Sequence, residues 1–286
     1  MVGCRTSPHE PILRALLSGL FNDCSVPAGA IVDSGAHRGG ESCFFATIAM
    51  QRMVHAIEPV PDNVLALNRM RAGAQGALDN LRVRLGALGA QHGKLSAAQL
   101  HTSGTMAKLA PGSTAGTGSS QDADGDSSVP VDKLDDLFDS ERLGFAHLDV
   151  EGSEPDVLRG GSGVISRDQP LIAVEVHFDG AHRNLSSSVL NELASHNYNS
   201  YLVHEVCGLI PTCRNVIAVP CHLGRAPALD RAVTAGAISP INYARVFGAY
   251  HAVPRLTWSE RAAHANETRR LLTLLANANA TTRCRR

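Results

Sequence analysis

Residues 30–40 read Ala-Ile-Val-Asp-Ser-Gly-Ala-His-Arg-Gly-Gly, and the rest of the chain is interpreted outward from this stretch. Apolar residues lead into Asp33, a glycine-rich loop follows, and a helix-like run begins at Glu41. This order predicts a strand, a turn and a helix N-terminus, where Gly35 can adopt a positive φ and the first N–H groups favour an anionic or polar ligand. The glycine spacing does not match the dinucleotide fingerprint G-x-G-x-x-G. A turn of this kind is either structural or ligand-binding.

A second apolar run, Met-Val-His-Ala-Ile-Glu at 53–58, ends in an acid. A carboxylate at the end of the second strand of a βαβ unit is placed to accept the ribose hydroxyls of a nucleoside. We therefore expect Glu58 to bind a ribose. The alternative is that Glu58 only begins the turn Glu-Pro-Val-Pro and faces water.

Length, composition and charge exclude several classes of protein. The chain has 286 residues with 44% hydrophobic content, which suits one sizeable α/β domain with appendages. A formal charge of −1 gives no overall field for nucleic acid or anionic membrane. No apolar run approaches the roughly 18 residues that span a bilayer. We expect no nucleic-acid partner and no membrane span.

The cysteines favour an intracellular protein. Their number, seven, is odd and none forms a C-x-x-C pair, which argues against a disulfide framework and against a zinc site. We interpret them as reduced thiols in a cytoplasmic protein. They are Cys4, Cys24, Cys43, Cys207, Cys213, Cys221 and Cys284.

Composition divides the chain into three parts. Residues 1–29 form a leader with one amphipathic helix, residues 30–220 form the main domain, and residues 221–286 form a helical extension. Residues 90–128 are a flexible insertion because their small and polar residues offer too little apolar area to offset the entropy of ordering.

Strand-like runs alternate with helical patterns along the main domain, and a loop of eight residues joins the last two runs. This pattern predicts a Rossmann-like open α/β sheet, mostly parallel with an antiparallel closing strand, and with helices on both faces. Ligands of such sheets bind beyond the carboxyl ends of the strands. The expected strands are 30–33, 53–58, 81–88, 145–150, 170–177, 201–206 and 215–219.

Four runs together resemble the FkbM-type methyltransferases, which are S-adenosylmethionine-dependent enzymes with the class I methyltransferase fold. The resemblance covers about residues 30–220, and its most specific block is 148–160. The runs are Val-Asp-Ser-Gly-Ala-His-Arg-Gly from 32, Ile-Glu-Pro from 57, Leu-Asp-Val-Glu-Gly-Ser-Glu-Pro-Asp-Val-Leu-Arg-Gly from 148 and Glu-Val-His from 175.

The resemblance implies S-adenosylmethionine as cofactor and assigns residues to it. Asp33, Gly35 and Gly39 match the loop around the methionine part. His37 stands in that loop where the family usually has Asn.

Further along the chain, the resemblance places Glu58 on the ribose hydroxyls and Ala87 beside the adenine. Asp149 matches the residue near the methionine amino group and the site of transfer.

Methyl transfer to a hydroxyl requires alignment and a group that accepts a proton. His177 is the candidate base, with Asp149 and Glu151 as the catalytic alternatives, and we expect His177 and Asp149 to face the same crevice. A strand-end histidine can equally be structural, and Glu151 can instead brace the turn at Gly152. These residues with Glu175 could also hold a divalent ion. Their spacing does not require one, and we expect no metal.

The acceptor is expected to be a small molecule or a glycan. Two other functions stay open: a catalytically inactive cofactor-binding or scaffold protein of the same fold, and an NAD-dependent enzyme. A capping box at 257–260 predicts a helix over about 258–278 in a segment with seven arginines and two glutamates from Arg255 onward. This helix either packs through Leu271, Leu272 and Leu275 or docks an acidic protein partner.

Overall fold

The computed structural model describes residues 10–96, 101–103, 106–108, 128–178, 183–207, 212–223, 226–241, 268–273 and 275. The chain divides into two compact units. Unit 1 contains Ala28–Pro170. Unit 2 contains the segment that ends at Pro27 and the chain from Leu171 onward. Most of the predicted flexible insertion lies outside the described residues, and the predicted three-part division stays a prediction.

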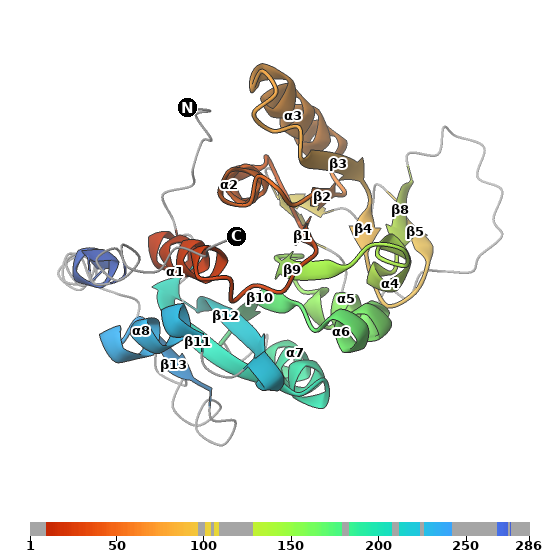
Figure 1. The fold of residues 1–286 in the computed structure, drawn as a ribbon. Helices are drawn as coiled ribbons and strands as arrows, with labels where there is room; N and C mark the ends of the chain where they lie inside the picture. Colours follow the sequence, from red (N-terminus) through yellow and green to blue (C-terminus); the bar gives the residue numbers. More distant parts are fainter. Residues whose placement is uncertain are drawn as a thin grey trace. The chain divides into compact units, whose positions relative to one another are not determined.

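Unit 1 is built on a parallel sheet in the order β9–β1–β2–β3 (Figure 1). Because the strands are parallel, their carboxyl ends meet at one edge of the sheet, where polar residues follow the buried apolar runs. The four strands are β1 (Ala30–Ser34), β2 (Val54–Glu58), β3 (Leu81–Leu85) and β9 (Leu143–Leu148).

Helices connect these strands, as the 3.6-residue periodicity predicts. The two βα crossovers of the first half use α2 (Gly40–Ile48) and α3 (Pro61–Gly73), and both helices contact the sheet. Pro61 stands in the first turn of α3, where its missing N–H costs nothing. The second half of unit 1 contains α4 (Leu134–Leu137), α5 (Glu154–Gly160) and α6 (Ser162–Asp168).

The predicted strand 81–88 is two strands. Leu85 still pairs with β2, but at Gly86 the chain leaves that sheet and Ala87 pairs with β8. The resulting small sheet has the order β4–β8–β5, and a separate hairpin joins β6 to β7. These strands are β4 (Ala87–Leu88), β5 (Gly93–Leu95), β6 (His101–Ser103), β7 (Met106–Lys108) and β8 (Val129–Asp132).

Unit 2 is antiparallel throughout its described strands. β12 pairs with β10 and with β11, and β11 pairs with β13. Its strands are β10 (Leu171–His177), β11 (Tyr198–Val206), β12 (Cys213–Pro220) and β13 (Ile238–Pro240), and its helices are α1 (Pro11–Asn22), α7 (Arg183–Ser195), η1 (Cys221–Leu223) and α8 (Pro227–Ala235). The predicted Rossmann-like class, with parallel strands first and antiparallel strands last, is confirmed.

The N-terminal helix α1 is fastened by an acid from far along the chain. The N–H groups of Ile12 and Leu13 donate to the two carboxylate oxygens of Glu205, at 2.9 and 3.0 Å. These N–H groups have no partner within a helix, so the buried carboxylate takes the place of a cap. Burial raises the pKa of Glu205 to about 7 against the opposing effect of the two N–H groups.

The region after Pro220 is not only helical, because it contributes β13 to the antiparallel sheet. Further on, residues 268–273 and 275 are helical, and Leu271 and Leu275 are buried as the packing interpretation expects. The capping box and most of the predicted helix 258–278 lie outside the described residues. No helix among those described is long and apolar enough to cross a membrane.

The prediction of reduced thiols is wrong for four cysteines and holds for Cys221, which is a free thiol. Cys207 and Cys213 form a disulfide with their Cα atoms 5.1 Å apart, and Cys24 and Cys43 are also disulfide-bonded. Cys207 follows β11 and Cys213 begins β12, so the antiparallel pairing brings the two sulfurs together at the base of the connecting loop. Disulfides of this kind belong to oxidising compartments, so the cytoplasmic assignment loses the argument on which it rested.

Candidate functional site

The glycine turn after β1 is shaped by a close backbone approach. Gly35 has a φ of 85°, and a Cβ atom there would lie 1.7 Å from the carbonyl oxygen of Asp149. The N–H of Asp149 donates to the carbonyl of Ser34 at 3.0 Å. The turn and the exit from β9 are therefore locked together, and no side chain larger than hydrogen fits at position 35.

Asp33 lies inside the protein rather than at its surface. It is 0% exposed. One carboxylate oxygen accepts a hydrogen bond from the hydroxyl of Ser42 in α2, and the other lies 2.8 Å from Nδ1 of His147. His147 stands opposite Asp33 in the register of β1 and β9. The acid thus ties one helix and two strands together beneath the glycine turn.

His147 carries a positive charge within this buried network. Burial lowers its pKa, but the hydrogen bond to Asp33 and the negative charges of Asp33, Glu41 and Asp149 outweigh burial and raise it to about 9. The imidazolium donates to Asp33, and the pair neutralises two charges that would otherwise be costly to bury. Sequence reasoning missed His147, although a histidine inside an apolar strand beside a strand-ending acid is a usable signal.

Glu58 closes the loop from the other side. The carboxylate, 4% exposed, accepts the N–H of His37 at 2.7 Å, the N–H of Val60 at 2.9 Å and the side-chain amide of Asn63 at 3.2 Å. Burial raises its pKa despite these donors. His37 therefore meets Glu58 through its backbone, with a positive φ of 48°.

The turn after β9 is braced by Glu154. Its carboxylate Oε1 accepts the N–H groups of Val150 and Gly152, both at 3.1 Å, so the bracing that the sequence suggested for Glu151 belongs to Glu154. Glu151 itself has a positive φ of 54°. Burial raises the pKa of Glu154 to about 7, against the donors and with help from the negative charge of Asp149.

The structure brings most of the predicted cofactor residues of unit 1 to one edge of the sheet. Direct contacts join Gly35 to Asp149 and His37 to Glu58, and the N–H of Gly86 donates to the carbonyl of Glu58 at 3.1 Å. Gly39, with a φ of 87°, is the N-cap residue of α2. Ala87 follows Gly86, and its side chain is buried in the small core of the β4–β8–β5 sheet.

Unit 2 holds the predicted base. His177, the last residue of β10, contacts Glu175 through Nε2 at 3.0 Å. Its backbone is fixed by Ser186 of α7, whose hydroxyl accepts the N–H of His177 and donates to its carbonyl oxygen. His177 and Asp149 belong to different units, and the expectation that they face one crevice stays a prediction.

The residues of unit 1 fit a nucleoside cofactor. Each carboxylate oxygen accepts two hydrogen bonds, and Oε2 of Glu58 has one donor among the contacts described above, so it can accept a ribose hydroxyl. The N-terminus of α2 adds backbone donors beside the same loop. A parallel sheet with such a turn and acid defines the class of nucleoside-binding α/β proteins.

Comparison with known families narrows the class. Residues 33–200 match the model of the Methyltransferase FkbM domain. The chain belongs to the FkbM methyltransferase family, which uses S-adenosylmethionine as cofactor. No curated protein matches the sequence.

Solved structures give only distant likenesses. The FkbM methyltransferase from Methylobacillus flagellatus KT has 18% identity and a TM-score of 0.47, covering 67% of this chain and 43% of its own. Precorrin-6y C5,15-methyltransferase from Geobacter metallireducens GS-15 has 11% identity and a TM-score of 0.41, and the match covers 73% of this chain and 86% of that protein. Aeropyrum pernix fibrillarin, with natively bound S-adenosyl-L-methionine, has 13% identity and a TM-score of 0.41, and the match covers 73% of this chain and 74% of that protein. This chain thus spans less than half of the Methylobacillus protein.

Proposed function

We propose that this chain transfers a methyl group from S-adenosylmethionine to a hydroxyl oxygen of a small molecule or a glycan. The bound cofactor supplies an electrophilic methyl group on a sulfonium. The observation that carries the proposal is the linked edge of unit 1, where the glycine turn, Glu58 and Asp149 are fixed to one another by backbone contacts. Such preorganisation is what binding and aligning a cofactor requires.

In this proposal each residue keeps the cofactor contact that the family resemblance implies. Glu58 accepts a ribose hydroxyl, the chain at Ala87 borders the adenine, and Asp149 receives the methionine amino group. Gly35 and Gly39 shape the loop around the methionine part. Asp33, held by Ser42 and His147, supports that loop from beneath.

His177 is the proton acceptor in this proposal. Its Nε2 faces the carboxylate of Glu175, which fixes the orientation of the ring and makes Nδ1 the nitrogen that accepts the proton of the attacking hydroxyl. Ser186 holds the strand end that carries the ring. Asp149 and Glu151 are the alternative bases.

Calorimetric titration with S-adenosylhomocysteine tests the cofactor site. Glu58→Gln should weaken binding by about 10-fold or more, because the charged acceptor of a ribose hydroxyl is lost. Glu141→Gln is the matched control, since Glu141 precedes β9 at the opposite ends of the strands and pairs with His55 there. Absence of binding to the wild-type chain, or equal losses in the two variants, would refute the cofactor site.

A search for products that gain one CH₂ group tests catalysis. On an identified acceptor, His177→Ala should lower turnover by about 10²–10⁴-fold and leave cofactor affinity nearly unchanged. Wild-type turnover in this variant would move the role of base to Asp149 or Glu151. Cofactor binding without turnover on any hydroxyl, amine or thiol of an extract would instead support the inactive binding or scaffold protein.

A further inference from the structure

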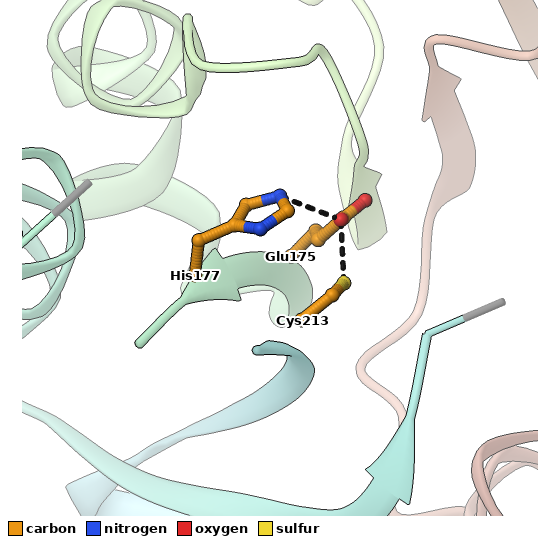
Figure 2. A group of neighbouring side chains, drawn as sticks. All are labelled: Glu175, His177 and Cys213. Carbon is orange, nitrogen blue, oxygen red and sulfur yellow. Dashed lines mark hydrogen bonds and ion pairs between the residues drawn. The ribbon is translucent and has the colours of Figure 1, made fainter. Parts of the chain in front are cut away.

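Three side chains of metal-binding type converge at one end of the antiparallel sheet of unit 2 (Figure 2). Glu175 and His177 lie two residues apart on β10 and therefore project from the same face of the strand. Cys213 begins β12 and stands opposite His177 in the strand register. Cross-strand neighbours of this kind have Cβ atoms about 4.5–5.5 Å apart, so the backbone itself gathers the three side chains.

The three ligand atoms lie within 4.8 Å of one another. Oε1 of Glu175 is 3.0 Å from Nε2 of His177 and 2.5 Å from Sγ of Cys213. Zinc bonds of about 2.0 Å to nitrogen or oxygen and about 2.3 Å to sulfur place ligand atoms roughly 3.5 Å apart in a tetrahedron. Small rotations of these side chains would therefore make room for an ion between them.

The burial of the cluster suits an ion that enters from solvent. Cys213 is fully buried, whereas the side chains of Glu175 and His177 are 14% and 18% exposed. The sulfur would thus form the floor of the site, and the carboxylate and imidazole its mouth. One thiolate, one imidazole and one carboxylate are the ligand types that zinc accepts.

The oxidised state of Cys213 prevents binding. A thiolate is the metal ligand, and in this structure the sulfur of Cys213 is bonded to that of Cys207. We propose that Glu175, His177 and Cys213 form a Zn²⁺ site that the Cys207–Cys213 disulfide keeps closed and that reduction opens. A dithiol reductant supplies two electrons and two protons, becomes a disulfide and leaves two thiols. The thiol proton of Cys213 then passes to solvent as the ion binds.

The site does not rest on the proposed methyl transfer, but it bears on it. Coordination through Nε2 leaves the ring proton of His177 on Nδ1, the nitrogen that the proposed function uses as base. The zinc-bound chain would then lack its proton acceptor. Three protein ligands also leave the fourth position to water or to a small molecule.

Two cysteine variants separate the effect of losing the disulfide from the effect of losing the proposed metal ligand. Cys207→Ser and Cys213→Ser both abolish the disulfide, but only Cys207→Ser keeps the proposed ligand. Both are made with Cys221→Ser, because Cys221 is an exposed free thiol that could pair with the released cysteine. Titration with Co²⁺, without any reductant, then reports thiolate coordination as a charge-transfer band in the near ultraviolet, and competition with Zn²⁺ gives the affinity.

We expect Cys207→Ser to bind one Co²⁺ with the charge-transfer band and Cys213→Ser to show no band. Adding His177→Ala or Glu175→Gln to Cys207→Ser should weaken Zn²⁺ binding beyond the about 10–100-fold that loss of an outer-shell partner costs. The oxidised wild-type chain should bind only after reduction with a phosphine. Equal binding by both cysteine variants would overturn the site. The absence of a charge-transfer band in both Cys207→Ser and the reduced wild-type chain would also overturn the site. The reduced wild-type chain is included because Cys207→Ser could lack the band through misfolding alone.

Discussion

The buried pair of Asp33 and His147 should make the stability of this protein fall in mildly alkaline solution. His147 has a pKa of about 9 in the folded chain against 6.5 for an ordinary histidine. The folded state therefore binds more protons than the unfolded state between these two values. Its contribution to stability is fully present below pH 6.5 and is lost as the pH rises through about 9.

The size of the effect follows from the shift. At 1.36 kcal/mol for each unit of pKa, the whole shift corresponds to about 3 kcal/mol, and about 2 kcal/mol of it disappears between pH 7 and pH 9. Because the pair is buried, solvent screens its electrostatic interaction only weakly, and the free energy calculated from the pKa shift needs little reduction. Glu154 and Glu205, with pKa values of about 7, titrate mainly below this window.

Urea unfolding at pH 7, 8 and 9 measures the effect, with Cys221→Ser in every sample because a thiolate would exchange with the disulfides at high pH. His147→Gln keeps a donor to Asp33 but carries no charge, so its free energy of unfolding should be lower at pH 7 and nearly level up to pH 9. His55→Gln, which removes a histidine paired with Glu141, should keep the wild-type fall. An equal fall in His147→Gln and wild type would refute the reasoning.

Three further predictions concern a close backbone approach in unit 1 and buried carboxylates in both units. Gly35→Ala should destabilise the chain by more than about 3 kcal/mol, because it adds a strained positive φ to a backbone clash with Asp149, whereas Gly73→Ala, where a Cβ meets nothing within 4 Å, should be neutral or stabilising by urea unfolding. Glu205→Ala should cost about 1–3 kcal/mol for each of the two α1 N–H groups left buried without an acceptor, and hydrogen exchange should show α1 opening first. Glu154→Gln should reduce the fall in stability between pH 4.5 and pH 7, because the raised pKa of this carboxyl means that the folded state loses its extra proton over that range; an unchanged pH profile would contradict its assignment.

Local periodicity was enough to predict the regular elements. The apolar runs before Asp33 and Glu58 appear as β1 and β2, and the amphipathic helix expected within residues 1–29 appears as α1 (Pro11–Asn22). In these segments hydrophobic spacing favours one structure, and the proline in the first turn of α1 agrees with it. Agreement among local signals of this kind makes an element predictable.

Elements that depend on distant pairing were missed or misjudged. The predicted strand 81–88 divides at Gly86 because Ala87 pairs with β8, more than forty residues away in sequence. β13 has three residues, too few for an alternating pattern to be visible, and exists because it pairs with β11. The strand ending at Leu148 starts at Leu143, two residues earlier than its apolar run suggests.

The site was predicted by residue type better than by role. The sequence identified the glycine turn, Glu58 and Asp149 as neighbours at strand ends, and the contacts within unit 1 agree. The sequence could not show that the carboxylate of Asp33 is hydrogen-bonded to His147 and Ser42, because the contact with His147 depends on the register of β1 with β9. The odd number of cysteines argued against disulfides, so the Cys207–Cys213 bond was not predicted. The two residues nevertheless belong to the connection of a predicted antiparallel pair.

The attachment of α1 to Glu205 sets an order on biosynthesis. The two hydrogen bonds join residues 193 and 192 positions apart, so at about 5–20 residues per second the acceptor is made roughly 10–40 s after the helix. Every strand of unit 1 leaves the ribosome within that interval. Unit 1 can therefore fold while translation continues, whereas α1 must wait for the synthesis of Glu205 before its own N-terminus is satisfied.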